Sequence, residues 1–306
     1  MSNSPGTDRD ILTQKAYATD EMLSIRQRTH ELYSVPKINF TEWVLDRIEW
    51  RGDERVLDLG SGSGTYFTLL RQRIPEGSLI AGDLSMGMAR KAQEHPDAGI
   101  ILNLDAQDLP FGDNCFDVVL ANHMLYHVPD LDRTLSEIRR VLKPTGCLLA
   151  ATNSQFNLPE FEQLIRRSYG LLGAVGSDIE PMHPTAHNFY LEDGAMRLAH
   201  HFFAVARYDL PSAFIFPSVE PVLDYINSTR ALREPQLPRR ISWDDFMNVM
   251  GDQVQRLINH FGELVVNKLT GVLIGTDQGG FAADYVSLLD RDQQNDTPNW
   301  DNGQSQ

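Results

Sequence analysis

The chain has 306 residues, with 27 lysines and arginines against 42 aspartates and glutamates, which gives a formal net charge of -15 at pH 7. An acidic surface repels phosphate backbones and anionic lipids, so we expect no nucleic-acid partner and no membrane partner. Two cysteines, Cys115 and Cys147, exclude a disulfide framework or a cysteine-rich zinc module. The N-terminus is polar and no apolar run approaches about 18 residues, so a cytoplasmic protein is expected.

The N-terminal part is predicted to be helical. About the first nine residues are expected to be disordered, as chain ends often are. Residues 11–33 and 40–50 then carry apolar positions at helical spacing. Val35 before Pro36 separates the two helices, because a proline disfavours helical conformation in the residue before it. Residues 1–50 are therefore expected to precede the main sheet as a helical segment.

Residues 56–64, with the sequence Val-Leu-Asp-Leu-Gly-Ser-Gly-Ser-Gly, organise the chain. A short strand runs into Gly60, Gly62 and Gly64, and residues 65–71 read as the start of a helix. Such a unit presents backbone N–H groups and a helix N-terminus to a ligand at the carboxyl edge of a parallel sheet. The dinucleotide pattern requires a third glycine where this chain has Thr65, so a nicotinamide oxidoreductase is disfavoured.

A second acidic residue ends the next predicted strand, residues 77–83. Asp83 lies 19 residues after Gly64, where a carboxylate can accept hydrogen bonds from both hydroxyls of a ribose. Asp58, the glycine loop and Asp83 together resemble the class I S-adenosylmethionine (SAM) methyltransferases, and the resemblance implies that all of them bind SAM. A plain tight turn for the loop and a helix N-cap for Asp83 are the alternatives.

The third predicted strand, residues 100–104, is followed by Asp-Ala-Gln-Asp-Leu-Pro-Phe at 105–111. This run is similar to the adenine-recognition turn of the ubiquinone/menaquinone-biosynthesis branch of the same family. The resemblance implies that the Asp105 carboxylate accepts from the adenine amino group and that the Ala106 N–H donates to the ring. Leu84, after the second strand, would border the adenine.

The fourth predicted strand, residues 116–122, carries the Phe-Asp-x-Val pattern typical of the family. Asn122 and His123 stand where a parallel sheet places its functional loops, and the resemblance implies that they contact the cofactor. His127 matches a family position on the methyl side of the cofactor and is the candidate general base, since histidine is the usual base near neutral pH. A hydrogen bond that orders the loop is its alternative role.

No metal is expected. His183 and His187 are four residues apart and could share a metal ion on a helix, but Pro184 between them argues against a helix.

These elements predict an α/β fold, a Rossmann-like sheet of seven mostly parallel strands with an antiparallel edge strand and helices on both faces. Residues 51–153 would form the SAM-binding core. Residues 154–277 would add a helical lid that binds the acceptor, together with the closing strands near 203–209 and 264–275. Residues 278–306 are polar and are predicted to be disordered. In the resembling family N-terminal helices cover the cofactor, which makes Tyr17 and Tyr33 candidates for contact with it.

The resemblance implies a SAM-dependent methyltransferase that acts on a small molecule, either a natural product or a cofactor precursor, as a monomer or a homodimer. A SAM-binding regulatory or scaffold protein without turnover is the alternative. It would keep the same cofactor motifs, so turnover with an acceptor separates the two.

Overall fold

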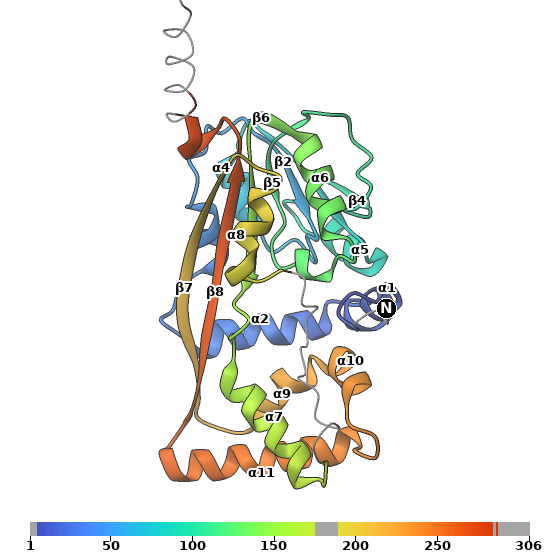
Figure 1. The fold of residues 1–306 in the computed structure, drawn as a ribbon, viewed down its shortest axis with the longest axis vertical. Coiled ribbons are helices and arrows are strands. Elements are labelled where there is room, and N and C mark those ends of the chain that lie inside the picture. Colours follow the sequence, from blue (N-terminus) through green and yellow to red (C-terminus); the bar gives the residue numbers. More distant parts are fainter. Residues whose placement is uncertain (1–4, 175–188, 284–285, 287–306) are drawn as a thin grey trace, which may run out of the picture.

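The computed structural model describes residues 5–174, 189–283 and 286. Its centre is a sheet of eight strands in the order β1-β7-β8-β6-β5-β2-β3-β4 (Figure 1). The strands are β1 (Ser34–Val35), β2 (Arg55–Leu59), β3 (Ser78–Asp83), β4 (Ile100–Asn103), β5 (Phe116–Leu120), β6 (Leu142–Asn153), β7 (Ala204–Phe216) and β8 (Leu264–Thr276). Strands β2 to β6 pair in parallel, and β8 pairs antiparallel with both β6 and β7.

The predicted α/β fold with a mostly parallel sheet is confirmed, with one strand more than expected. The extra strand is β1, which pairs antiparallel with β7 through Ser34 and Val35. Pro36 cannot continue the preceding helix, so the chain leaves it extended and completes the unpaired edge of β7.

Helices cover both faces of the parallel part of the sheet. Alternate residues of a strand point to opposite faces, and accordingly Leu57 and Val119 pack beneath α6 and α8, while Val56 and Val118 pack beneath α3 and α4. The longer helices are α2 (Glu21–Tyr33), α3 (Phe40–Leu45), α4 (Phe67–Arg73), α5 (Met86–Gln93), α6 (Leu131–Val141), α7 (Pro159–Leu171), α8 (Leu191–Ala199), α9 (Glu220–Asn227) and α11 (Trp243–Phe261).

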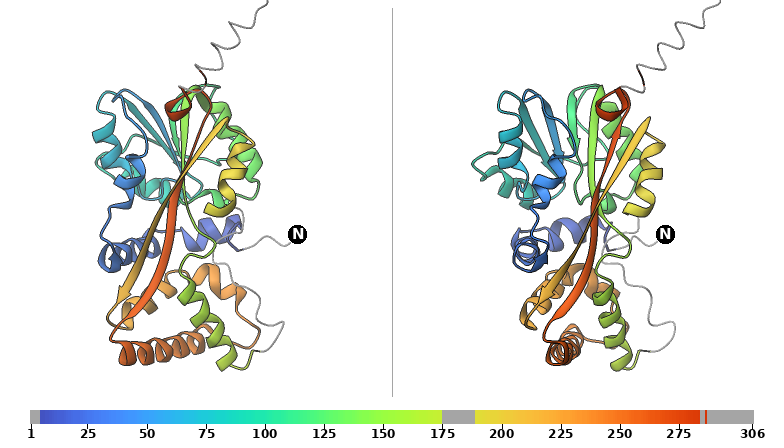
Figure 2. Two further views of the ribbon diagram at one scale, coloured as in Figure 1. Left: turned by 60° about the vertical axis from the view of Figure 1, so that its left-hand side comes forward. Right: turned by 90° about the vertical axis from the view of Figure 1, so that its left-hand side faces the viewer.

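Strands β7 and β8 form a long antiparallel pair, called the hairpin below, which extends past the ends of the other strands. Its far half runs past the parallel strands into a second apolar core, where Phe214, Phe216 and Val266 pack with α7, α9 and α11. Figure 2 shows the two strands crossing from one lobe to the other. The residues predicted as a lid thus form a lobe that faces the carboxyl edge of the sheet, and α2 lies between the two lobes (Figure 1).

The N-terminal segment is less regular than the predicted helix over residues 11–33. A short helix α1 (Arg9–Ile11) continues into a π-helical turn η1 (Leu12–Ala16), and α2 begins only at Glu21. The break lets the Tyr17 carbonyl accept a hydrogen bond of 2.7 Å from the hydroxyl of Ser85, the N-cap residue of α5. This bond attaches the N-terminal segment to the start of α5. Leu12 and Ala16 pack against Leu232 of the second lobe.

At the C-terminal end of the described chain, the short 3-10 helix η5 (Gly280–Ala282) follows β8. Residues 284–285 and 287–306 of the predicted polar tail lie outside the described residues, as do His183 and His187. No helix in the described part of the chain is long and apolar enough to cross a membrane.

Candidate functional site

A cavity of about 1530 Å³ lies between the carboxyl edge of the sheet and the second lobe. All ten predicted cofactor residues line it, namely Asp58, Gly60, Gly62, Gly64, Asp83, Leu84, Asp105, Ala106, Asn122 and His123. His127 lines it as well. The sequence therefore identified one wall of a single site.

The glycine loop joins β2 to α4 and is tied to the neighbouring strand. The N–H groups of Gly60 and Ser61 both donate to the Gly82 carbonyl, at 2.8 and 3.2 Å. Gly60, Gly62 and Gly64 all have positive φ, which residues with a Cβ atom rarely adopt. A Cβ at Gly60 or Gly64 would lie 2.6 Å from another side chain, whereas at Gly62 the nearest atom would be Leu23 Cδ2 at 3.4 Å.

Asp83 closes the loop from the end of β3. Its Oδ2 accepts from the Gly62 N–H at 3.0 Å and its Oδ1 accepts from the Ser85 N–H at 2.8 Å. Burial raises the pKa of Asp83, and these two hydrogen bonds act in the opposite direction. Ser85, not Asp83, caps α5, because the Ser85 hydroxyl accepts from the Met88 N–H. The N-cap alternative for Asp83 is therefore excluded.

Asp58 lies beneath the loop with 2% of its surface exposed. Its Oδ2 atom is buried and has no hydrogen-bond partner among the described residues. Burial, assisted by the nearby Asp83, raises the pKa of Asp58 to about 8. A buried carboxyl group with an unused oxygen is costly by itself and is suited to a cationic group of a ligand.

Asp105 and Ala106 follow β4, with Leu84 on the adjacent strand end. The Asp105 carboxylate accepts from the Gln107 N–H at 3.0 Å and pairs with Arg9 at 3.3 Å. Arg9 belongs to the N-terminal segment, so this segment closes over the end of the cavity that the sequence assigned to adenine.

Asn122 and His123 follow β5. Asn122 Oδ1 accepts from the Ala151 N–H at 2.9 Å, and its Nδ2 is buried without a partner in the described chain. His123 adopts a φ of 55°, and its N–H donates to the Ala151 carbonyl at 2.8 Å. Burial lowers the pKa of His123 to about 4, so its ring is neutral at pH 7.

His127 is not arranged as a free base. Its Nδ1 lies 2.7 Å from the Gly6 carbonyl, which can only accept, so Nδ1 carries the proton. Its Nε2 therefore accepts from the Tyr17 hydroxyl at 3.0 Å. Burial lowers the pKa of His127 to about 4. Both ring nitrogens are thus engaged by the N-terminal segment, which favours the ordering role, and the role as base stays a prediction.

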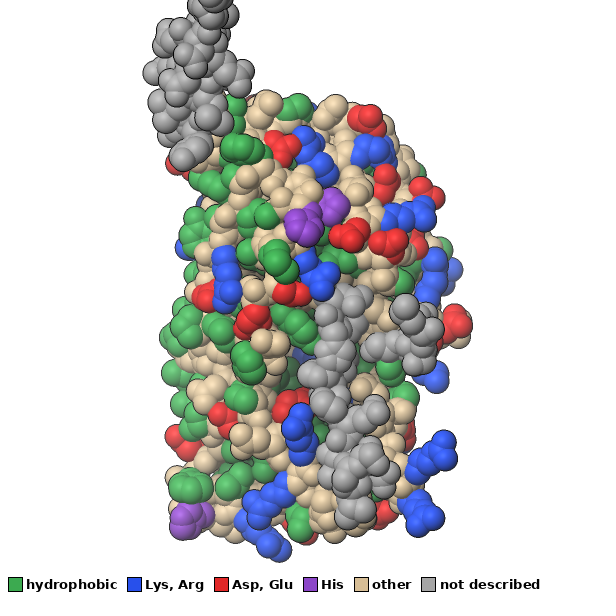
Figure 3. Space-filling view, in the orientation of Figure 1, with side chains coloured by type: hydrophobic (Ala, Val, Ile, Leu, Met, Phe, Trp, Pro, Cys, Tyr) green, Lys and Arg blue, Asp and Glu red, His purple; other side chains and the backbone are tan. Residues whose placement is uncertain are grey.

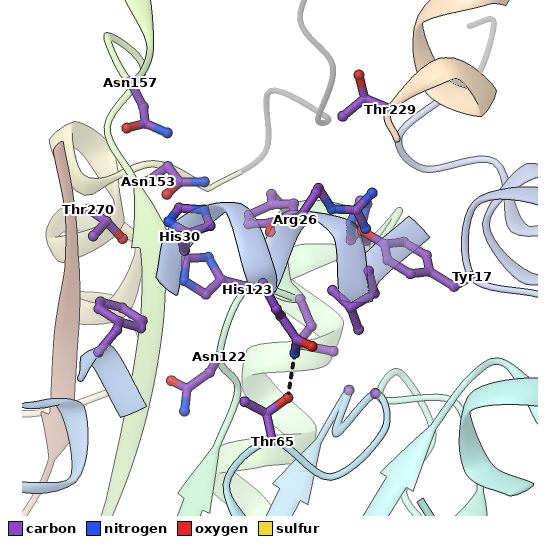
Figure 4. A pocket seen from close by; sticks show the side chains of 18 of the residues that line it. Tyr17, Arg26, His30, Thr65, Asn122, His123, Asn153, Asn157, Thr229 and Thr270 are labelled. Atoms are coloured by element: carbon purple, nitrogen blue, oxygen red, sulfur yellow. Dashed lines mark hydrogen bonds between the residues drawn. The ribbon is translucent and has the colours of Figure 1, made fainter. Parts of the chain in front are cut away.

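The sequence did not identify the wall that α2 and β8 supply. Figure 4 shows Arg26 and His30 extending from α2 into the cavity, on the side facing Asn122 and His123. Gln27 Nε2 donates to Thr65 Oγ1 at 2.9 Å and so joins α2 to the glycine loop. Of the two tyrosines proposed for cofactor contact, Tyr17 lines the cavity, whereas Tyr33 packs against Phe216.

Other sites find no support in the described residues. No group of three or more metal-ligating side chains is found in the part of the chain that the structure describes. On the face drawn in Figure 3, basic side chains are interspersed with acidic ones over the sheet lobe. The large cavity is therefore the site on which a function can be argued.

Comparison with known proteins agrees with this geometry. Residues 57–150 match the family model described as Methyltransferase domain. The ubiquinone/menaquinone biosynthesis C-methyltransferase of Xylella fastidiosa (strain 9a5c) is 39% identical over 103 residues, which are 31% of this chain and 41% of that protein. The chain thus spans less than half the length of this relative, and the match is confined to the core.

Two solved structures share the fold over most of the chain. Phosphoethanolamine N-methyltransferase 2 of Haemonchus contortus, in complex with phosphomonomethylethanolamine and S-adenosylhomocysteine, gives a TM-score of 0.51 at 16% identity and covers 88% of this chain and 60% of that chain. The [4+2]-cyclase SpnF gives 0.54 at 15% identity and covers 90% and 99%. At such identities the likeness concerns the fold alone, and the two proteins are named for different reactions.

Proposed function

We propose that the protein transfers a methyl group from SAM to a small-molecule acceptor, because residues 57–150 match the Methyltransferase domain model and the core is similar to ubiquinone/menaquinone biosynthesis C-methyltransferases. One observation carries the proposal. The glycine loop, held by Asp83, borders the same cavity as the buried and unpartnered carboxyl oxygen of Asp58. This combination offers backbone donors, a carboxylate and a site for a cation within one pocket.

The residues fit SAM part by part. Asp58 would hold the ammonium group, Asp83 the ribose hydroxyls, and Asp105 with Ala106 and Leu84 the adenine. Arg26 lies on the α2 face that crosses the glycine loop, and no carboxylate of the described chain pairs with it within 4.0 Å. Its Nη1 donates to the Ser228 carbonyl at 2.8 Å, and its remaining N–H donors would serve the carboxylate of the cofactor.

SAM supplies an activated methyl group, so the protein has to bind, align and exclude water. Asn122 and His123 lie at the end of β5, where the cavity opens from the sheet toward the second lobe. The neutral ring of His123 brings no positive charge next to the sulfonium. His127 and Tyr17 hold the N-terminal segment over the site and thereby limit access of water.

Calorimetric titration with SAM, S-adenosylhomocysteine and NAD tests the cofactor, and we expect binding of the first two alone. Transfer of a labelled methyl group from SAM to small molecules then tests the activity. Binding without transfer to any acceptor would favour the silent regulatory or scaffold protein. Binding of NAD in place of SAM would contradict the proposal.

A further inference from the structure

Lys268 occupies an unusual place in the hairpin. It stands on β8, two residues before Thr270 in the sequence, and Thr270 pairs with Asn153 at the end of β6. Because β8 is antiparallel to β6, Lys268 lies on the side that extends past this end. At about 3.3 Å per residue this puts Lys268 some 7 Å past the carboxyl edge of the parallel strands. Its side chain is part of the cavity wall, although only 8% of the residue is exposed. It therefore lies on the acceptor side of the site.

The Lys268 ammonium has two hydrogen-bond acceptors and no counterion. Its Nζ donates to Ser34 Oγ at 2.6 Å and to His30 Nδ1 at 3.1 Å, and it lies 4.1 Å from the centre of the Phe214 ring. Within the described ranges no carboxylate lies within 4.0 Å of it. An ammonium group has three protons, so one donor remains. A buried cation without an anion is costly, which favours an anionic ligand beside it.

His30 supplies a second donor at the same place. Because its Nδ1 accepts from Lys268, the proton of the neutral ring is on Nε2. Enclosure in the cavity and then the charge of Lys268 lower the pKa of His30, which keeps the ring neutral. The ring lies 4.8 Å from that of Phe214 and 6.3 Å from that of Tyr225. Figure 4 shows it beside His123, the residue that follows β5.

We propose that the acceptor carries a carboxylate, which pairs with the Lys268 ammonium and accepts from the Nε2–H of His30. This inference rests on the proposed methyl transfer and adds the chemical class of its substrate. An ammonium and an N–H donor side by side match the two oxygens of a carboxylate. The aromatic rings of Phe214 and Tyr225 would flank an apolar body attached to the carboxylate. The group to be methylated is then another part of the molecule, held nearer to His123.

The cofactor does not account for this cation. Arg26 is one helical turn before His30 and next to Gln27, which contacts the glycine loop at Thr65. The carboxylate of SAM therefore has its own guanidinium closer to the loop. Lys268 lies on β8, a strand that is outside the glycine-loop wall and continues into the second lobe.

The test uses the full-length protein saturated with S-adenosylhomocysteine and titrated with benzoate and, separately, with its neutral isostere benzamide. We expect benzoate to bind more tightly than benzamide, and Lys268→Met to weaken benzoate binding by about tenfold or more, the effect of removing a charged hydrogen-bond partner. His30→Phe should weaken it less, and His30→Gln should restore part of the loss, since Gln keeps an N–H donor.

Lys91→Met is the control for the loss of one lysine charge, because Lys91 is exposed on α5, outside the cavity lining, and pairs with Glu94 at 3.0 Å. It should leave benzoate binding nearly unchanged. Equal binding of benzoate and benzamide, no benzoate binding by the wild type, or full binding by Lys268→Met would overturn the inference. Weaker S-adenosylhomocysteine binding by a folded Lys268→Met would also overturn it, by assigning Lys268 to the cofactor. Failure of the wild type to bind S-adenosylhomocysteine would instead refute the proposed function.

Discussion

The Tyr17 hydroxyl donates a hydrogen bond of 3.0 Å to His127 Nε2 and so joins the N-terminal segment to the loop after β5. The other nitrogen of the same ring donates to the Gly6 carbonyl. A histidine that the sequence offered as a base is thus a point of attachment for the segment that closes the cavity.

This attachment can be measured by a double-mutant cycle. Tyr17→Phe and His127→Ala should each destabilise the protein, and the double variant should show a coupling of about 0.5–1.5 kcal/mol, the range for one hydrogen bond. Denaturant unfolding gives the free energies. Tyr33→Phe combined with His127→Ala is the control and should be additive. Tyr17→Phe also frees His127 Nε2. A rise in turnover of this variant would support His127 as a base and contradict the ordering role.

Binding of SAM should release a proton from Asp58. With a pKa of about 8 in the free protein, the Asp58 carboxyl is largely protonated at pH 7, and a bound ammonium would lower this pKa. Affinity should therefore rise between pH 6 and pH 8, with release of up to about one proton. Calorimetry in buffers of different ionisation enthalpy measures the release. Asp58→Asn should abolish it, whereas a release that persists in this variant would have another source.

Asp83→Ala should weaken SAM binding by about 1–3 kcal/mol, because it removes a charged acceptor and also frees the Gly62 N–H. Asp83→Asn keeps one acceptor oxygen and should lose less. Calorimetric titration gives both values. Asp113→Asn, which alters an exposed carboxylate paired with Arg140, is the control. Unchanged affinity in Asp83→Ala would remove this residue from the cofactor site.

Gly62→Val should abolish SAM binding and leave a folded protein. The φ of 57° at Gly62 costs a residue with a Cβ atom about 1–2 kcal/mol of folding free energy. The added Cβ, however, would meet only Leu23 Cδ2, at 3.4 Å. Gly262→Val imposes a similar backbone cost at the end of α11, with no atom within 4 Å, and should still bind SAM. Gly60→Ala should instead impair folding, because its Cβ would collide with Met124. Thermal unfolding and calorimetry separate these outcomes, and SAM binding by Gly62→Val would reduce the loop to a simple turn.

The sequence by itself determined the parallel half of the sheet and the wall of the site that it carries. Asp58, the glycines, Asp83 and Asp105 lie at strand ends or in the loops that follow them, and parallel strands bring their carboxyl ends to one edge. Local pattern and spacing are therefore enough to assemble this wall. The strand count differed by one because β1 exists only through its pairing with β7.

Only the tertiary structure decided what faces that wall. His30 and Lys268 are 238 residues apart, and they meet because β8 overruns the sheet while α2 crosses above the glycine loop. The partners of His127 are likewise 110 and 121 residues away. Contacts of this range depend on the register of the hairpin and the path of the N-terminal segment, neither of which is encoded in local periodicity.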